Sequence, residues 1–142
     1  MSQAKENMAL IERWVETYQK EGYEAGIAMI EEVFAPDVTY STLTAREVEG
    51  RTVHGREQLV SVFEELDEMF GGVTYEVEGL DQVGTDVIVV LYELRGEGSG
   101  SGVPITMPLS VVYEFEDGRV KRGTVYENVK EGMDAARAAA HA

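Results

Sequence analysis

The main change in the spacing of apolar residues along this chain lies at Gly71-Gly72, and that change restricts the folds open to it. Before Gly71-Gly72 they recur every three or four positions, as on one face of an α-helix. After this glycine pair they alternate with polar residues, as in strands that have one buried face. The predicted order is two helices, a strand, a third helix, four strands and a closing helix, and this order predicts an α+β fold in which one curved sheet packs against the helices.

The boundaries of the predicted elements follow from the same spacing and from residues that end helices. Pro36 should end the second helix, because proline lacks an amide hydrogen and clashes with the preceding turn. Gly71-Gly72 should end the third. The predicted helices cover residues 2–20, 23–34, the residues after Gly55, and 129–139; the predicted strands cover 37–43, 73–80, 86–96, 103–116 and 119–128, with a polar loop over 44–52.

Composition and charge exclude several classes of protein. The chain is 44% hydrophobic over 142 residues, which predicts a single domain, residues 1–142, with one core. There is no cysteine, so disulfides and thiolate metal sites are excluded and a cytoplasmic location is expected. A net charge of -15 repels phosphates, so we expect no nucleic acid as a partner. No stretch is long and apolar enough to predict a membrane segment.

His54 opens the segment HGREQLVSVFEEL, and it could be either a catalytic histidine or the start of an amphipathic helix. Gly55 is typical of a turn into a helix, and Glu57 would lie at the positive end of the helix dipole. These signals favour the structural interpretation. We therefore expect His54 to face solvent or to form a local hydrogen bond.

Several short motifs follow one another in an order that resembles a known superfamily. They are FAPDVTYST, the segment HGREQLVSVFEEL, a meander of strands, and a late FEDGRV followed by VYEN at a strand end. This order is similar to that of the nuclear transport factor 2-like superfamily, which includes ketosteroid isomerases and SnoaL-like polyketide cyclases. The resemblance implies a conical, curved antiparallel sheet wrapped around N-terminal helices, with one apolar pocket inside and commonly a dimer.

The strand over 86–96 has two apolar faces, which alternation separates. The concave face would line the pocket. The convex face, with Val112 beside it, is too apolar to remain exposed, and this predicts a homodimer through the convex sheet face. The predicted concave residues are Ile88, Val90, Tyr92 and Leu94; the predicted convex residues are Val87, Val89 and Leu91.

The register of the last hairpin decides which polar group enters the pocket. A three-residue loop over 116–118 would put Glu127 on the face of Met107. A two-residue turn at Asp117-Gly118 would put Tyr126 there instead. The superfamily's register favours the longer loop, so we predict Glu127 near the pocket.

Glu127 is the candidate catalytic residue, because an apolar environment would raise its pKa and let it exchange protons near neutral pH. Alternatively, it lies at a strand end and points to solvent. The tryptophan, tyrosine and threonine residues among the other candidates could donate hydrogen bonds to a ligand carbonyl, or could only pack in the core. The predicted substrate-binding residues are Trp14, Tyr18, Tyr40, Thr42, Phe63, Tyr92, Met107, Leu109 and Val111.

The resemblance also argues against two activities of the superfamily. Ketosteroid isomerases use a tyrosine and two aspartates, where this chain has Trp14, Thr42 and Val111. The carboxylates of limonene-epoxide hydrolases are likewise absent, with Val125 at the last of those positions. What remains is a SnoaL-like domain that binds a small, mostly apolar, carbonyl-containing molecule. It would act as an acid-base isomerase, cyclase or lyase, or only bind or dimerise. No metal spacing or nucleotide motif is present, so no metal and no cofactor are expected.

Overall fold

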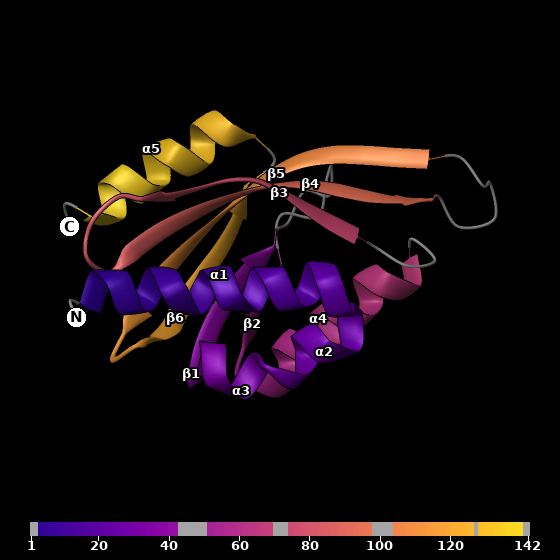
Figure 1. The fold of residues 1–142 in the computed structure, drawn as a ribbon, viewed down its shortest axis with the longest axis horizontal. Helices are drawn as coiled ribbons and strands as arrows, with labels where there is room; N and C mark the ends of the chain where they lie inside the picture. The colour runs from indigo at the N-terminus through magenta and orange to yellow at the C-terminus, as the bar shows by residue number, and fades with distance from the viewer. Residues whose placement is uncertain (1–2, 43–50, 70–73, 98–103, 127, 141–142) are drawn as a thin grey trace.

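The computed structural model describes residues 3–42, 51–69, 74–97, 104–126 and 128–140. A curved, open sheet of six strands forms its centre, in the order β2-β1-β6-β5-β4-β3 (Figure 1). The strands are β1 (Phe34–Thr42), β2 (Arg51–His54), β3 (Thr74–Gln82), β4 (Val87–Glu97), β5 (Pro104–Glu116) and β6 (Arg119–Tyr126). The helices are α1 (Gln3–Glu21), α2 (Tyr23–Ala28), α3 (Ile30–Val33), α4 (Arg56–Met69) and α5 (Val129–Ala140).

The main core lies between the concave face of the sheet and helices α1 to α4 (Figure 1). Alternate residues of β4, namely Ile88, Val90 and Tyr92, are buried in it, which confirms the predicted parity. From the helices, Trp14 and Leu59 enter the same core. The predicted α+β fold with one sheet around N-terminal helices is therefore confirmed.

The convex face of the sheet is covered by α5 on the opposite side from α1 (Figure 1). Val87, Val89 and Val112 pack there with Ala136 of α5 in a second buried cluster. The prediction that these valines need a cover was right, but the chain's own last helix provides it. A homodimer stays a prediction, and this patch no longer requires one.

Helix α5 is attached to the sheet at its first turn. The Oδ1 atom of Asn128 accepts a hydrogen bond from the amide of Glu131 at 2.8 Å, as the side chain of a helix N-cap does. Ser110 Oγ on β5 donates to the carbonyl oxygen of Asn128, also at 2.8 Å. Gly132 then lies so close to Ser110 that a Cβ at position 132 would be 2.6 Å from the Ser110 Cβ. The absence of a side chain at Gly132 therefore lets α5 lie flat on the sheet.

Two stretches differ from the sequence prediction. The predicted helix over 23–34 is two short helices joined at Met29, and Phe34 is already extended because it pairs with Val120 of β6. The predicted polar loop over 44–52 overlaps β2, whose four residues pair with β1. Four residues are too few for alternation to show. In addition, the sheet is not wholly antiparallel, since β1 and β6 run parallel.

The β5–β6 hairpin combines a tight turn with a bulge. Asp117 and Gly118 have φ angles of 53° and 80°, as in a two-residue type I′ turn. The predicted three-residue loop is therefore wrong. The strand β6 then contains an unpaired residue, Lys121, after which Val111 pairs with Val125. The bulge returns Val125 to the side of the sheet that the longer loop predicted, but the pairing is shifted by two residues, since Gly123 pairs with Tyr113.

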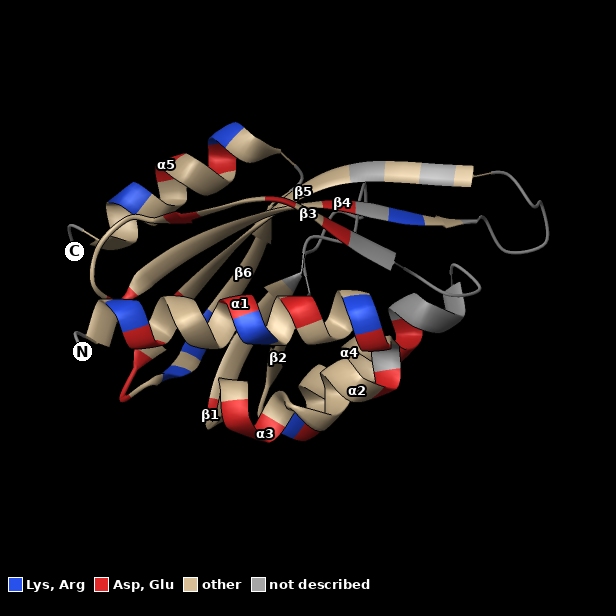
Figure 2. Ribbon diagram, in the orientation of Figure 1, with Lys and Arg blue, Asp and Glu red and all other residues tan. Residues whose placement is uncertain are grey.

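Residues of both charges occur along α1 and α5 (Figure 2). Glu64 and Glu65 on α4 are exposed, as solvated charges should be. In the part of the chain that the structure describes, no helix is long and apolar enough to span a bilayer.

Candidate functional site

An aromatic cluster occupies the concave side of the sheet, with side chains from α1, β1, α4, β4 and β5. Trp14 packs edge-on against Phe34, with 5.2 Å between ring centroids. Tyr40 packs against Phe63 at 5.8 Å. We use the name aromatic cluster for Trp14, Phe34, Tyr40, Phe63, Tyr92 and Tyr113.

Four members of the aromatic cluster were predicted from the sequence, and two were missed. Tyr113 shares the face of Val111, so strand alternation could have identified it as a polar candidate. Phe34 was assigned to a helix, and only its pairing with β6 shows that its ring enters the core from β1. The cluster is therefore assembled by sheet register as much as by the helices.

Trp14 and Tyr18 of α1 both contact Gly26 of α2. The Nε1 atom of Trp14 donates a hydrogen bond to the carbonyl oxygen of Gly26 at 3.1 Å. The ring of Tyr18 occupies the space that a side chain at position 26 would need. The N–H of Trp14 thus bonds within the protein, so Trp14 offers a ligand apolar surface, whereas Tyr18 is half-buried beside it.

The hydroxyls of Tyr40 and Tyr92 differ in their partners. The Tyr92 hydroxyl lies 3.1 Å from that of Tyr113, and both side chains are buried. The Tyr40 side chain is only 4% exposed, and within the described residues its hydroxyl has no hydrogen-bond partner. A buried hydroxyl without a partner costs about 1–3 kcal/mol. In the described part of the core, Tyr40 therefore presents a donor that has no acceptor.

Burial keeps these phenols protonated. It raises the pKa of Tyr40, and the neighbouring Tyr92 and Tyr18 raise that pKa further. Burial also raises the pKa of Tyr92, against a smaller lowering by its hydrogen bond with Tyr113. At neutral pH both phenols keep their protons, so they can donate hydrogen bonds and cannot serve as general bases.

The remaining predicted site residues divide into described and undescribed ones. Val111 is buried in the main core, and Leu109 is half-buried against it. Tyr126, the alternative to Glu127, packs against the convex cluster. Glu127 itself and the side chains of Thr42 and Met107 lie outside the described part of the structure.

His54 has a structural position at the start of α4. Its side chain is exposed, and its amide donates to Gln58 Oε1 at 2.9 Å. Gly55 adopts a φ of 85°, which favours glycine. Arg56 Nε then donates to the carbonyl oxygen of Phe34 at 3.0 Å, which holds α4 against β1. The prediction of an exposed, locally bonded His54 is confirmed.

The family model of the SnoaL-like domain matches residues 11–123 of the chain, from α1 into β6. The chain belongs to this SnoaL-like family. The matched residues include the whole aromatic cluster. Among proteins with curated descriptions, no match to the sequence is found.

Solved structures share the fold of this SnoaL-like domain. An NTF2-like protein of unknown function from Burkholderia pseudomallei K96243 has a TM-score of 0.72 at 20% identity, with 96% of this chain and 98% of that chain covered. A candidate SnoaL-like polyketide cyclase from Jannaschia sp. CCS1 has a TM-score of 0.70 at 21% identity, with 94% and 93% covered. TerC, co-crystallized with polyporic acid, has a TM-score of 0.70 at 16% identity, with 94% and 98% covered. At these identities the likeness concerns the fold.

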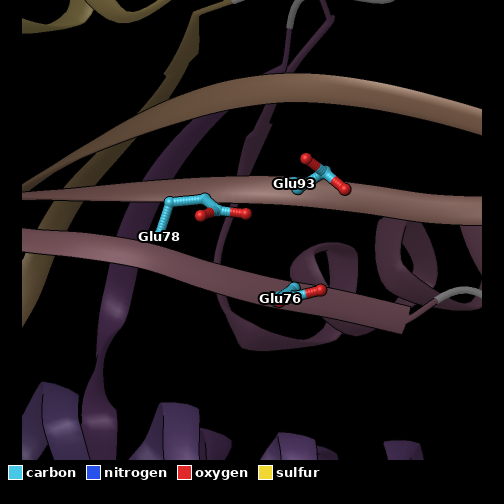
Figure 3. A group of neighbouring side chains, drawn as sticks. All are labelled: Glu76, Glu78 and Glu93. Carbon is cyan, nitrogen blue, oxygen red and sulfur yellow. The ribbon is translucent and has the colours of Figure 1, made fainter.

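An acidic group lies on the convex face of the SnoaL-like domain, away from the aromatic cluster. Carboxylate oxygens of Glu76, Glu78 and Glu93 lie within 4.8 Å of one another (Figure 3). Arg95 pairs with Glu76 at 2.8 Å and with Glu93 at 2.6 Å. Alternation in β3 could have placed Glu76 and Glu78 on one face, but the position of Glu93 depends on the β3–β4 register. Glu76 and Glu93 thus form a surface ion-pair group with Arg95, and the exposed Glu78 lies beside it.

Proposed function

We propose that this SnoaL-like domain binds a small, mostly apolar molecule with a carbonyl group, and that Tyr40 donates a hydrogen bond to that group. The observation that carries the proposal is the Tyr40 hydroxyl, which is buried and has no partner in the described part of the chain. A ligand carbonyl would satisfy this donor in a region from which water is largely excluded, where a hydrogen bond is strongest.

The chemistry of the surrounding residues supports a neutral ligand. The rings of Phe34 and Phe63 beside Tyr40 supply apolar contact area. Among the described residues, the buried polar or charged side chains outside the tyrosines are Asn7 and Ser110, and both bond to protein backbone. A carboxylate ligand would find no buried cation there to offset its desolvation. The net charge of -15 also disfavours anions.

The fold supports the proposal in a second way. TerC has the same fold and was co-crystallized with polyporic acid. A sheet and helices arranged in this manner therefore occur in a protein studied with a small organic molecule. This is support from the fold alone, and the ligand of the present chain is proposed from its own side chains.

A probe pair of matched shape tests the role of Tyr40. Acetophenone and ethylbenzene differ by a carbonyl in place of a methylene group, and calorimetry gives the affinity of each. We expect acetophenone to bind the wild-type protein about fivefold more tightly, as one added hydrogen bond predicts. Tyr40→Phe should remove this preference. Tyr126→Phe, which removes a phenol hydroxyl from the convex side, should keep it. If the wild-type protein binds neither probe, or both equally, the proposal is wrong.

The proposal extends from binding to catalysis. Strand alternation predicts that position 127 shares the side of Val125, which faces the main core. A carboxylate there would take a proton from the carbon next to the ligand carbonyl, while Tyr40 stabilises the oxygen of the resulting enolate. Return of a proton to another carbon would complete an isomerisation. The alternative is a module that binds its ligand and does no chemistry.

Proton exchange separates these two candidates. In heavy water, an acid-base catalyst would replace the methyl protons of acetophenone with deuterium, which NMR detects. We expect the wild-type protein to accelerate this exchange and Glu127→Gln to lose the acceleration while it retains binding. If wild-type protein binds acetophenone and does not accelerate exchange, the non-catalytic module is the better description.

A further inference from the structure

Tyr40 and Gly123 are neighbours across the parallel pairing of β1 and β6. The ring of Tyr40 occupies the space above Gly123. A Cβ atom at position 123 would lie 2.6 Å from Tyr40 Cδ2 and 2.8 Å from Cε2. Both distances are shorter than real side chains tolerate, so any residue with a Cβ would displace the ring.

The Tyr40 ring has little freedom to move aside. Phe34 lies on one side, with 6.4 Å between ring centroids, and Phe63 lies at 5.8 Å. Gly123 itself is buried. Glycine within a strand costs conformational entropy and adds no contact area, so its presence usually marks the close approach of another group. Here that group is the ring that carries the unsatisfied hydroxyl.

We infer that Gly123 is a specificity-determining residue of the proposed ligand site. Because Gly123 has no Cβ atom, the Tyr40 ring can pack directly against β6. This packing fixes the position of the Tyr40 hydroxyl and therefore the point at which it would meet a ligand carbonyl. The inference rests on the proposed function, because it assigns a role to Gly123 through Tyr40. Gly123 is thus a positioning residue, and Tyr40 is the residue that contacts the ligand.

The first test asks whether the ring and position 123 compete for the same space. We expect Gly123→Ala to lower the urea midpoint of unfolding strongly in the wild-type background and much less in a Tyr40→Val background, since valine suits a strand and lacks the ring, and the cavity left by Tyr40→Val is common to both proteins of that background. Gly79→Ala is the matched control: it is also a strand glycine, but its Cβ would lie 3.5 Å from Leu91 Cδ1, an ordinary contact. If Gly123→Ala alone fails to fold, recovery of folding in the double variant supports the inference. An equal loss from Gly123→Ala in the two backgrounds overturns it.

The second test measures specificity in the folded variant. The quantity is the ratio of the ethylbenzene Kd to the acetophenone Kd. We expect Gly123→Ala to lower this ratio about fivefold, the value of one hydrogen bond, and Gly79→Ala to leave it unchanged. Adding Tyr40→Phe to Gly123→Ala should lower it no further.

The outcomes separate this inference from the proposed function. If Tyr40→Phe lowers the ratio of Kd values and Gly123→Ala does not, Tyr40 donates a hydrogen bond to the carbonyl, but Gly123 does not position the Tyr40 ring. The inference then fails while the proposed function stands. If Tyr40→Phe leaves the ratio at its wild-type value, the proposed function fails, and the role of Gly123 fails with it.

Discussion

The hydroxyl groups of Tyr40 and Tyr92 lie on the same face of the sheet, but they should affect the stability of the fold in opposite directions. Tyr92 shares a hydrogen bond with Tyr113, whereas the Tyr40 hydroxyl has no partner among the described residues. A buried polar group that is satisfied stabilises the fold, and one that is not lowers its stability. A ligand-binding donor is expected to belong to the second kind, because the ligand is its partner.

Phenylalanine substitutions at these two positions should therefore differ in sign. We expect Tyr40→Phe to leave the free energy of unfolding unchanged or to raise it by up to about 1 kcal/mol, since it removes an unsatisfied hydroxyl. Tyr92→Phe should lower it by about 1 kcal/mol, because a buried hydrogen bond is lost. Urea unfolding without ligand measures both. Equal losses in the two variants would show that the Tyr40 hydroxyl has a partner in the protein.

The raised pKa values of the two tyrosines predict a loss of stability in alkaline solution. Burial raises both above the ordinary value of 10.0. Below that pH the folded and unfolded chains both keep these protons, so stability does not depend on them. Above it, the unfolded chain releases protons that the folded chain retains. The free energy of unfolding then falls by about 1.4 kcal/mol per pH unit for each tyrosine.

Tyr40→Phe should remove one of the two tyrosine contributions to the fall of the free energy of unfolding with pH. Urea unfolding from roughly pH 9 to pH 11 measures the slope in both proteins, below and above the ordinary tyrosine pKa. Tyr126→Phe, on the half-buried convex side, is the comparison for a more accessible phenol. A slope that Tyr40→Phe does not change would mean that the Tyr40 hydroxyl ionises as freely in the folded protein as in the unfolded one.

For a single residue, the sequence predicts on which side of a strand its side chain lies, but not with which atoms that side chain forms hydrogen bonds. Alternation placed Ile88, Val90 and Tyr92 in the core because a strand has a period of two. It could not show that Tyr113 would bond Tyr92, since that depends on the pairing of two strands. Nor could it show that Tyr40 lies over Gly123, which requires β1 and β6 to be parallel neighbours.

Among the elements, the β5–β6 hairpin depends on a turn that only certain residues can form. Asp117 and Gly118 both have positive φ angles, which asparagine, aspartate and glycine tolerate best. A side chain at position 118 would have room, since its nearest neighbour is Gln3 Nε2 at 3.6 Å. Any effect of Gly118→Ala should therefore come from backbone strain.

We expect Gly118→Ala to lower the free energy of unfolding by about 1–2 kcal/mol, the cost of a left-handed conformation for a residue with a Cβ. Asp117→Asn should be neutral or slightly stabilising, because Asn-Gly is favoured in type I′ turns. Thermal or urea unfolding compares the two. If Gly118→Ala has no effect, this turn does not limit the stability of the hairpin.

The same hairpin explains why elements could be predicted better than their register. The strands of the second half and all the long helices were predicted within a few residues. The bulge at Lys121 leaves no pattern in the sequence, because an inserted residue in a strand differs little from a longer turn. The wrong loop length and the missed bulge compensate only in the side of the sheet on which Val125 lies, while its pairing differs from the predicted one by two residues. Likewise β2 was missed because its pairing with β1, more than its composition, makes it a strand.

In the whole molecule, one sheet separates two apolar regions with different covers. Helices α1 to α4 cover the aromatic cluster, and α5 covers the smaller convex cluster. The cover of the convex cluster uses small residues, among them Gly132 and Ala136, which bring the helix close to the sheet but contribute little apolar area of their own. Docking of α5 should thus depend on close contact more than on large side chains.

A valine that cannot fit beneath α5 should undock it and expose the convex valines. At Gly132 a side chain would overlap Ser110, whereas Ala138 on the same helix is exposed. We expect Gly132→Val to self-associate, because exposure of Val87, Val89 and Val112 creates an apolar patch that a second copy can cover. Ala138→Val adds the same side chain at an exposed position and lowers helix propensity, which Gly132→Val does not; it should nevertheless behave as the wild-type chain. Sedimentation velocity over a range of concentrations measures the association. If Gly132→Val and Ala138→Val sediment alike, α5 is not what keeps this face of the sheet from a partner.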